Sequence, residues 1–393
     1  MDNAWIAMMM GLLILLASMA SVEVGISVAL VEIGFGIIAG NFFGLHSTPW
    51  IDFLAGFASI VLTFLAGAEV DPDLLREKFK ESALIGGLSF LLPFLGTWAF
   101  CYFIVGWTNP ASQIAGVALS TTSLAVVYAV LVETGLTNAP IGKLIMASTF
   151  VTDLGTALAL SLLFIRPTWW IVPFVLVSAA LIVMMPRLKP WFFSRYGNRV
   201  IEPEIKGAFA ALLVLMYFSH LAESHAVLPA FLLGLAVAKI FHRHREEQRR
   251  FRIVTFALLT PFFFIKSGMI VSLGLVLANI GLLLILLAVK QVPKFIGVYP
   301  LAKRYVPEHA MYTTLLMSTG LTFGTISSLY GLNAGILMQA QFSVLVTVVV
   351  LSAIIPTMIA QRYFDPRRSA KFAREAAQAT LIGPLQVIER KEG

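Results

Sequence analysis

The stretch that decides the fold is LIMASTFVTDLGTALALSLLF, residues 144–164. It is apolar throughout, and its length is what a helix needs to cross a bilayer. One carboxylate, Asp153, lies near its middle, preceded by Thr152 and followed by Gly155 and Thr156. A charged side chain at that depth costs about 2.5–3.5 kcal/mol on insertion scales and commonly marks an ion pathway. The rest of the chain is therefore interpreted as a scaffold that buries Asp153 and gives it a partner and a route to water.

The composition is that of a membrane protein with many spans. Of the 393 residues, 59% are hydrophobic and 12% are charged, and the mean hydropathy is +0.88. Soluble domains carry about 25% charged residues. We expect no cleaved signal peptide, because a second apolar segment follows the first almost at once. The single cysteine, Cys101, excludes an intramolecular disulfide and any cysteine-based metal site.

Thirteen apolar segments have about the length of a spanning helix, and this predicts an all-α polytopic fold. The first two segments nearly touch, so a count of twelve is the alternative. The segments lie near residues 4–21, 23–43, 50–69, 82–105, 112–134, 140–164, 168–186, 205–222, 226–242, 253–273, 275–301, 309–331 and 335–360.

Basic residues are confined to alternate loops. Of the 28 Lys and Arg residues, 24 lie in one set of loops, which includes residues 187–206 and 239–252, and in the tail. The opposite set of loops holds only Arg166. The positive-inside rule then places the N-terminus outside a cell membrane and the C-terminus in the cytoplasm, which requires an odd number of spans. The net charge of +7 thus reflects topology, and we expect no nucleic-acid partner.

We interpret residues 1–364 as one transmembrane domain and residues 365–393 as a short basic cytoplasmic tail. The tail is too short for a regulatory nucleotide-binding domain. The chain contains no GxGxxG after a strand and no Walker motif, so we expect neither a dinucleotide nor ATP as cofactor.

Two acids, Asp153 and Glu32, sit well inside predicted spans. Asp153 is either a structural ion pair between helices or a carrier of a monovalent cation and a proton. Burial favours the protonated acid and a nearby cation favours the carboxylate, so the balance of the two allows exchange near neutral pH. Thr152 supplies a hydroxyl oxygen suited to a small cation. For Glu32, whose helix is rich in glycine, we expect close packing with a satisfied carboxyl group.

Two spans contain runs of small hydroxylated residues that weaken an apolar helix. One run comprises Ser120, Thr121, Thr122 and Ser123, and the other contains Ser318, Thr319, Gly320 and Thr322. Such runs at corresponding places in two halves indicate broken helices that cross at the membrane midplane. There the freed carbonyl groups and half-helix ends can hold an ion. The alternative is a flexible packing seam.

Three lysines lie inside apolar segments. Lys290 and Lys294 are one turn apart and share a helix face. Either one is a candidate charge partner for Asp153, and Lys294 is also close enough to the helix end to extend toward the cytoplasmic surface. For Lys266, nearer the outer surface, we expect the side chain to extend outward.

With these residues in view, the chain resembles the monovalent cation:proton antiporter superfamily, and in particular its Kef-type and NapA-type branch. The resemblance runs from about residue 23 to 361 and rests on the order and spacing of several pieces. These are VEIGFGIIAGNFFG (31–44), FLAGFASIVLTFLAGAEVDPDLLREK (53–78), ALSTTSLAVVYAVLVETGL (118–136), IGKLIMASTFVTDLGTALAL (141–160), LPAFLLGLAVAK (228–239), LTPFFFIKSGMIV (259–271) and VPKFIGVYPLA (292–302).

The resemblance implies a thirteen-helix inverted-repeat fold with two broken helices. It implies an ion-binding core (near residues 112–164 and 275–331) that moves against a scaffold (near 4–69 and 205–242), which forms a homodimer. Asp153 looks like the ion-binding aspartate of this branch, and Lys294 looks like its lysine partner. If the alignment with the family is shifted by one helical turn, Lys290 takes the position of the lysine partner.

The chain departs from this family at three places. Thr152 stands where relatives carry Asp, Asn or Gln, the second broken helix lacks the Arg-Gly-Glu of many relatives, and Lys266 replaces a neutral residue.

We therefore expect a secondary antiporter that exchanges Na⁺ or K⁺ for protons, with the membrane lipid as its surroundings and no cofactor. A cation channel or the pore of a larger assembly is one alternative, and an ion-coupled symporter of organic anions is another. An integral-membrane enzyme is not expected, because the spans hold no nucleophile–base pair and no metal triad.

Overall fold

A computed structural model describes residues 3–25, 27–70, 78–136, 139–164, 168–197, 199, 201–222, 224, 226–243 and 245–366. The predicted basic tail from residue 367 onward, the basic loop 71–77 and Arg166 lie outside these residues. Within the described residues every regular element is a helix, so the all-α prediction is confirmed.

The helices follow the predicted spans closely. Their bounds are α1 Asn3–Val24, α2 Val28–Phe42, α3 Pro49–Ala68, α5 Phe79–Ala99 with the π-helical turn η1 Phe100–Val105, α6 Asn109–Ser120, α7 Leu124–Glu133, α8 Pro140–Leu163, α9 Ile171–Tyr196, α10 Pro203–Leu221, α11 Val227–Arg243, α12 Arg245–Val254, η2 Thr255–Leu259, α13 Thr260–Ile270, α14 Leu273–Ala278, α15 Ile280–Tyr305, η3 Pro307–His309, α16 Ala310–Met317, α17 Thr322–Asn333 and α18 Gln339–Tyr363.

Each of the thirteen predicted segments corresponds to one helix or to one interrupted helix. Ten helical runs in the described part of the chain are long and apolar enough to cross a membrane, and α2 and α11 are shorter apolar helices. The interrupted pair α16 and α17 accounts for the last segment. The helices α1 and α2 are separate, with Gly25 between them in the left-handed conformation (φ 69°). The boundary between the first two predicted segments is therefore confirmed.

Two boundaries differ from the prediction. The basic segment predicted as part of a loop forms the helix α12, which continues through η2 into α13 without a break. Its charged residues hide this helix from a hydropathy argument, because only one face of α12 is apolar. The predicted span 275–301 is divided at Asn279, whose side chain donates to the Leu275 carbonyl group (2.8 Å) and ends α14.

Two sets of helices repeat the same order, which is one whole helix, one broken helix and one whole helix. The first set is α5, α6 with α7, and α8, and the second is α15, α16 with α17, and α18. Their contacts correspond as well, because α8 packs on α16 and α17 just as α18 packs on α6 and α7. This pairing is what an inverted repeat produces.

In two other pairs of helices, the helices pack closely against each other at glycine residues. A methyl group on Gly36 of α2 would overlap the backbone of Ile265 in α13, and one on Gly67 of α3 would overlap the backbone of Phe231 in α11. The partner glycines Gly268 and Gly234 are equally confined. Small residues allow two helix backbones to approach closely inside a membrane. Both crossings therefore depend on glycine.

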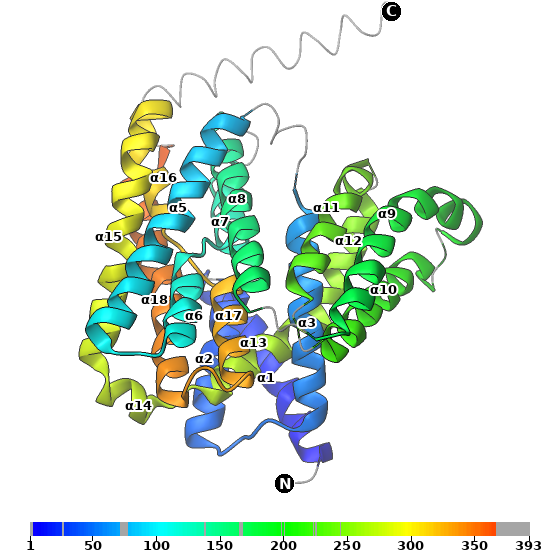
Figure 1. The fold of residues 1–393 in the computed structure, drawn as a ribbon, viewed down its shortest axis with the longest axis horizontal. Helices are drawn as coiled ribbons and strands as arrows, with labels where there is room; N and C mark the ends of the chain where they lie inside the picture. Colours follow the sequence, from blue (N-terminus) through cyan, green and yellow to red (C-terminus); the bar gives the residue numbers. More distant parts are fainter. Residues whose placement is uncertain are drawn as a thin grey trace, which may run out of the picture.

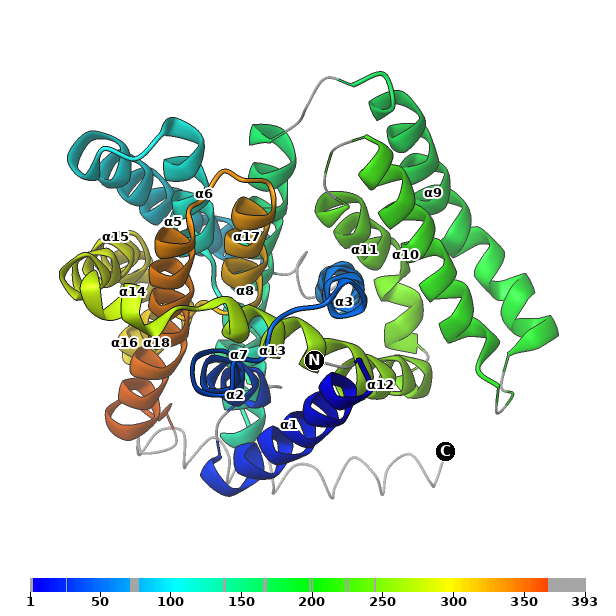
Figure 2. The same cartoon turned by 90° about the horizontal axis from the view of Figure 1, so that it is seen from below.

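Figure 1 shows two groups of helices side by side. We call α5–α8 and α15–α18 the core group, and α3 with α9–α12 lie on the other side of the molecule. The view from below separates α5, α6, α15 and α18 from α9, α10 and α11 in the same way (Figure 2). We call α1–α3 and α9–α13 the scaffold group, because α2 packs on α13, and α3 packs on both α11 and α13.

Candidate ion-binding site

The site begins with the two breaks, because each ends a helix inside the core group. The helix α6 stops at Ser120, and Thr121 takes an extended conformation (φ −65°, ψ 153°). The hydroxyl group of Thr121 donates to the Ala118 carbonyl group (3.1 Å). In the second break, the hydroxyl group of Thr319 donates to the Leu316 carbonyl group (2.7 Å). Such local bonds offer the backbone an alternative to the helical ladder, so the hydroxyl runs explain the breaks.

The two breaks contact each other directly. Thr122 Oγ1 donates to the carbonyl oxygen of Met317 (2.8 Å), and the Ser123 amide donates to Thr319 Oγ1 (3.5 Å). All four residues are buried. We call residues 121–123 and 318–321 together the crossing. The predicted pair of crossing broken helices is therefore present.

Lys294 is bound at the crossing by four oxygen atoms. Its ammonium group donates to the carbonyl oxygens of Met317 (2.8 Å) and Thr121 (2.9 Å). It also donates to Thr122 Oγ1 (2.9 Å) and to Ser89 Oγ of α5 (3.2 Å). The two carbonyl groups terminate α6 and α16, where the helix dipoles place partial negative charge. The lysine thus compensates the ends of two half-helices at once.

Lys290 reaches the same crossing but has a different environment. Its side chain is fully buried, and among the described residues its amine has no hydrogen-bond partner. It lies against Gly320, where a Cβ atom would overlap the lysine nitrogen. The two lysines therefore differ sharply: Lys294 has four oxygen atoms at hydrogen-bond distance, whereas the Lys290 amine has no partner among the described residues.

Asp153 is 2% exposed, and its Oδ1 atom has no hydrogen-bond partner among the described residues. Asp153 is in none of the ion pairs found between described residues. Those pairs join Arg250 to Glu202, Arg252 to Glu69 and Lys266 to Asp52. Asp153 therefore forms no direct ion pair with a lysine in this arrangement, although Lys294, the expected charge partner, interacts with it electrostatically. The carboxylate keeps an oxygen atom available for a ligand.

A cavity of about 440 Å³ connects Asp153 with one side of the molecule. Leu124 and Thr322, the first residues of α7 and α17, line it beside Asp153. Helix N-termini carry partial positive charge, so they offset the negative charge of the Asp153 carboxylate. At the other end the cavity is lined by Glu69 and Arg252. We call this space the Asp153 cavity.

Other predicted residues lie outside the Asp153 cavity. The hydroxyl group of Thr152 faces carbonyl groups, Ser148 O at 3.1 Å and Gly86 O of α5 at 3.4 Å. It is one residue, or about 100°, around the helix from Asp153. Ser318 donates to the Thr314 carbonyl group (2.7 Å) within its own helix. Of the predicted hydroxyl residues, Thr122 and Thr322 line the cavity with Asp153.

Two further titratable residues have distinct surroundings. Lys266 bonds Asp52 at the start of α3 (2.7 Å); the lysine side chain is 6% exposed and the aspartate side chain 51%. Its amine therefore extends, as expected, toward the start of α3, where it meets a half-exposed carboxylate. Glu32 is buried, but its Oε2 atom has no partner among the described residues, so a satisfied carboxyl group is not what the structure shows.

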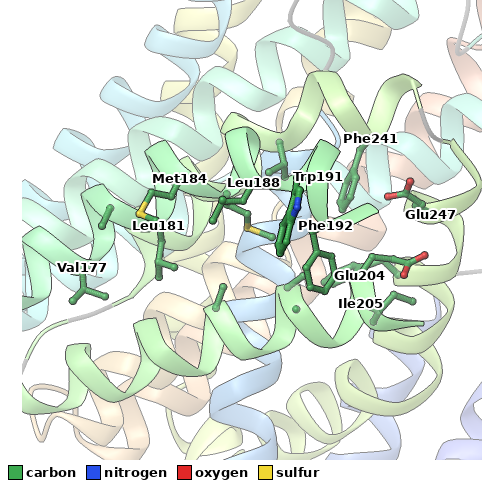
Figure 3. Close-up of a pocket in the computed structure, with 17 residues that line it drawn as sticks. Val177, Leu181, Met184, Leu188, Trp191, Phe192, Glu204, Ile205, Phe241 and Glu247 are labelled. Atoms are coloured by element: carbon green, nitrogen blue, oxygen red, sulfur yellow. The ribbon is translucent and has the colours of Figure 1, made fainter. Parts of the chain in front are cut away.

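A second cavity, of about 370 Å³, lies apart from the crossing (Figure 3). Its walls are apolar side chains of α9–α12, such as Leu181, Met184 and Phe241, with Glu204 and Glu247 at one end. None of the residues predicted to bind the ion lines it.

Sequence reasoning missed Ser89, which bonds Lys294, because one serine in an apolar helix carries no signal of its own. It also missed Tyr128, Glu69 and Arg252 at the open end of the Asp153 cavity. The charges of Glu69 and Arg252 stand at the ends of predicted spans, where a solvated position is the ordinary interpretation, and Tyr128 is a neutral residue within an apolar span.

Comparison with known proteins agrees with this geometry. A family model described as "Sodium/hydrogen exchanger, transmembrane" matches residues 9–364. Similar curated proteins include probable Na⁺/H⁺ antiporter 3 of Methanocaldococcus jannaschii, which is 24% identical over 86% of this chain and 90% of its own length. The Na⁺/H⁺ antiporter NhaS4 of Synechocystis is 26% identical over 81% and 82%.

The Na⁺/H⁺-K⁺ antiporter GerN of Bacillus cereus is 22% identical over 88% of this chain and 92% of its own length. Among solved structures, the sodium proton antiporter MjNhaP1 of M. jannaschii at pH 8 superimposes with a TM-score of 0.69. It shares 12% identity, and the match covers 93% of this chain and all of that one. At this identity the similarity concerns the fold.

Proposed function

The chain belongs to the sodium/hydrogen exchanger family, and we propose that it is a secondary antiporter that exchanges Na⁺ or K⁺ for protons at Asp153. Its relatives are transporters, and those compared above carry names of cation/proton antiporters. The single observation that carries the assignment of the site is the buried Asp153 carboxylate, which lies at the inner end of a cavity with an oxygen atom left unbonded.

Competition at one carboxylate couples the two fluxes. A cation that enters the Asp153 cavity exchanges part of its hydration shell for carboxylate and hydroxyl oxygens and displaces the proton. Thr122 and Thr322 are the hydroxyl residues that line the cavity beside Asp153. On the other side of the membrane a proton displaces the cation. Asp153 thus carries the cation across the membrane in one direction and the proton in the other, and no nucleotide is required.

The movement that follows is alternating access of the core group against the scaffold group. Lys294 keeps the crossing intact during this movement, because it joins both broken helices and α5. We assign the open end of the Asp153 cavity to the cytoplasm, because the basic loops predicted to be cytoplasmic adjoin the ends of α3 and α12 that line it. In this proposal the scaffold group supplies the homodimer contact. Membrane lipid covers the exposed apolar residues of α1 and α9.

The test uses proteoliposomes that contain a pH-sensitive dye and carry an imposed proton gradient. Na⁺, K⁺ and Li⁺ are added in turn to the wild type and to Asp153→Asn. Cation-driven collapse of the gradient by the wild type, absent in the variant, establishes exchange at Asp153 and identifies the ion. Exchange by Asp153→Asn at the wild-type rate would refute the assignment. Leakage of labelled cation without proton movement would favour a channel.

A further inference from the structure

Arg252 stands where the two groups of helices meet at the open end of the Asp153 cavity. Its Nε atom lies 3.2 Å from Oε1 of Glu69, the residue that follows α3. Its guanidinium carbon lies 5.2 Å from the ring centre of Tyr128 and 6.0 Å from that of Phe256. All four residues line the cavity. Arg252 therefore contacts three helical segments at one point.

These contacts differ in which parts of the molecule they join. Glu69 and Phe256 adjoin or belong to scaffold elements, as Arg252 itself does, so their contacts stay within one group. Tyr128 belongs to α7, one arm of the first broken helix in the core group. The contact between the guanidinium group and the tyrosine ring thus crosses the boundary between scaffold and core.

The ion pair prepares the guanidinium group for this contact. Glu69 lies at ion-pair distance from the Nε edge of the planar group, and the face of a guanidinium group can stack on an aromatic ring. The side chains of Arg252 and Glu69 are 35% and 20% exposed, so water reaches the pair but does not surround it. The carboxylate also lowers the net charge that a cation meets on entering the cavity.

We propose that Arg252 is a positioning residue of the exchange cycle: it holds α7 against the scaffold group and so stabilises the arrangement in which Asp153 is open to the cytoplasm. The inference rests on the proposed antiporter function and on its alternating access. Movement of the core group separates Tyr128 from Arg252, and the contact is made again on return. An Arg–aromatic contact of this kind shifts an equilibrium by about two- to five-fold.

The experiment measures access to the cavity beyond Tyr128. Ala125 lies on α7 and lines the cavity, and the native Cys101 is buried. We would place a cysteine at Ala125 in a Cys101→Ser background and label it with a membrane-impermeant maleimide from the cytoplasmic side. Arg252→Leu and Tyr128→Leu are each expected to slow labelling, by at most about five-fold, and the double variant no further than either single one.

Matched variants separate this contact from general effects of charge or folding. Arg250 lies on the same helix and pairs with Glu202 at 2.9 Å, but that pair joins scaffold residues only; Arg250→Leu should label at the wild-type rate. Tyr128→Phe keeps the ring and should also do so. Arg252→Lys keeps the charge but lacks the planar group, so it should label more slowly than the wild type.

Three results would overturn the proposal. The first is faster labelling of Arg252→Leu than of the wild type, which would mean that Arg252 obstructs the cavity. The second is labelling of both leucine variants at the wild-type rate. The third is that Arg250→Leu slows labelling as much as Arg252→Leu does. Proton–cation exchange is measured on the same preparations. Absence of exchange in the wild type would refute the proposed function, whereas exchange with unaltered labelling in the variants would refute only the role of Arg252. Monodisperse elution from size-exclusion chromatography checks that each variant folds.

Discussion

At the scale of single residues, the two buried lysines provide the sharpest contrast. The Lys294 ammonium group lies within hydrogen-bond distance of four oxygen atoms in and beside the crossing, whereas the Lys290 amine has no partner among the described residues. Both side chains are fully buried, and they stand one helical turn apart. Because the change in volume is the same at both positions, they form a matched pair for substitution.

We expect Lys294→Met to lower the free energy of unfolding by at least about 2 kcal/mol, because it leaves buried carbonyl groups without donors. Lys290→Met removes no hydrogen bond and removes a buried polar group, so the thermal midpoint should stay the same or rise. Thermal unfolding of both variants in one detergent checks this. A lower midpoint for Lys290→Met than for Lys294→Met would contradict the division of roles.

Sequence reasoning identified Asp153 and both lysines because charges are conspicuous in apolar spans. It did not establish that Lys294 bonds carbonyl oxygens instead of Asp153. That arrangement depends on where two half-helices end in space, and the ends of helices distant in sequence meet only in the folded chain. The hydroxyl group of Thr152 was expected at the ion, but its position around α8 directs it to the helix backbone and α5.

At the scale of helices, the glycine crossings fix how closely the scaffold elements approach. A Cβ atom at Gly234 would overlap the backbone of Phe64 in α3, whereas one at Gly87 of α5 would meet no atom within 4 Å. The helix backbone cannot yield as a flexible side chain does. Substitution of glycine by alanine at Gly234 and at Gly87 therefore compares the cost of a backbone clash with the gain in helix propensity.

Gly234→Ala is expected to destabilise the protein by about 1–3 kcal/mol through forced separation of α3 and α11. Gly87→Ala should be neutral or stabilising by up to about 1 kcal/mol, because alanine favours a helix over glycine. Thermal midpoints of the two variants decide the matter. Equal midpoints would show that the crossing adapts to a methyl group and that its glycines are not required.

The spans and both breaks were predictable because hydropathy and hydroxyl runs are local signals. The helix α12 was predicted as loop, since seven of its ten residues are Arg, Glu or Gln and conceal the apolar face that packs inward. The division between α14 and α15 was not predicted, for the opposite reason. It occurs at one asparagine within an otherwise apolar run, and hydropathy averages over such a residue.

At the scale of the whole molecule, the proposed orientation places the loop between α2 and α3 outside and the C-terminal end of α15 in the cytoplasm. His46 and Lys303 are exposed residues in these two places. In the Cys101→Ser background, we expect His46→Cys to react with an impermeant maleimide from outside the cell only. Lys303→Cys should react only in inside-out vesicles. The reverse pattern would invert the topology and the direction assigned to the Asp153 cavity.

The inverted repeat explains how one site faces both sides of the membrane. Because the two sets of core helices make corresponding contacts, an arrangement that opens the site toward one surface has a counterpart that opens it toward the other. A cation and a proton that compete for Asp153 are then exchanged by one movement of the core group. Competition is thus the central claim of the account.

The measurement that tests this claim most directly is the dependence of cation-driven exchange on pH in proteoliposomes, with pH held equal on both sides. If one carboxylate binds either a proton or a cation, the KM for the cation should rise toward about tenfold for each unit by which pH falls, while the maximal rate is unchanged. A KM that stays constant with pH while the maximal rate falls would mean that both bind at once, and it would contradict the account.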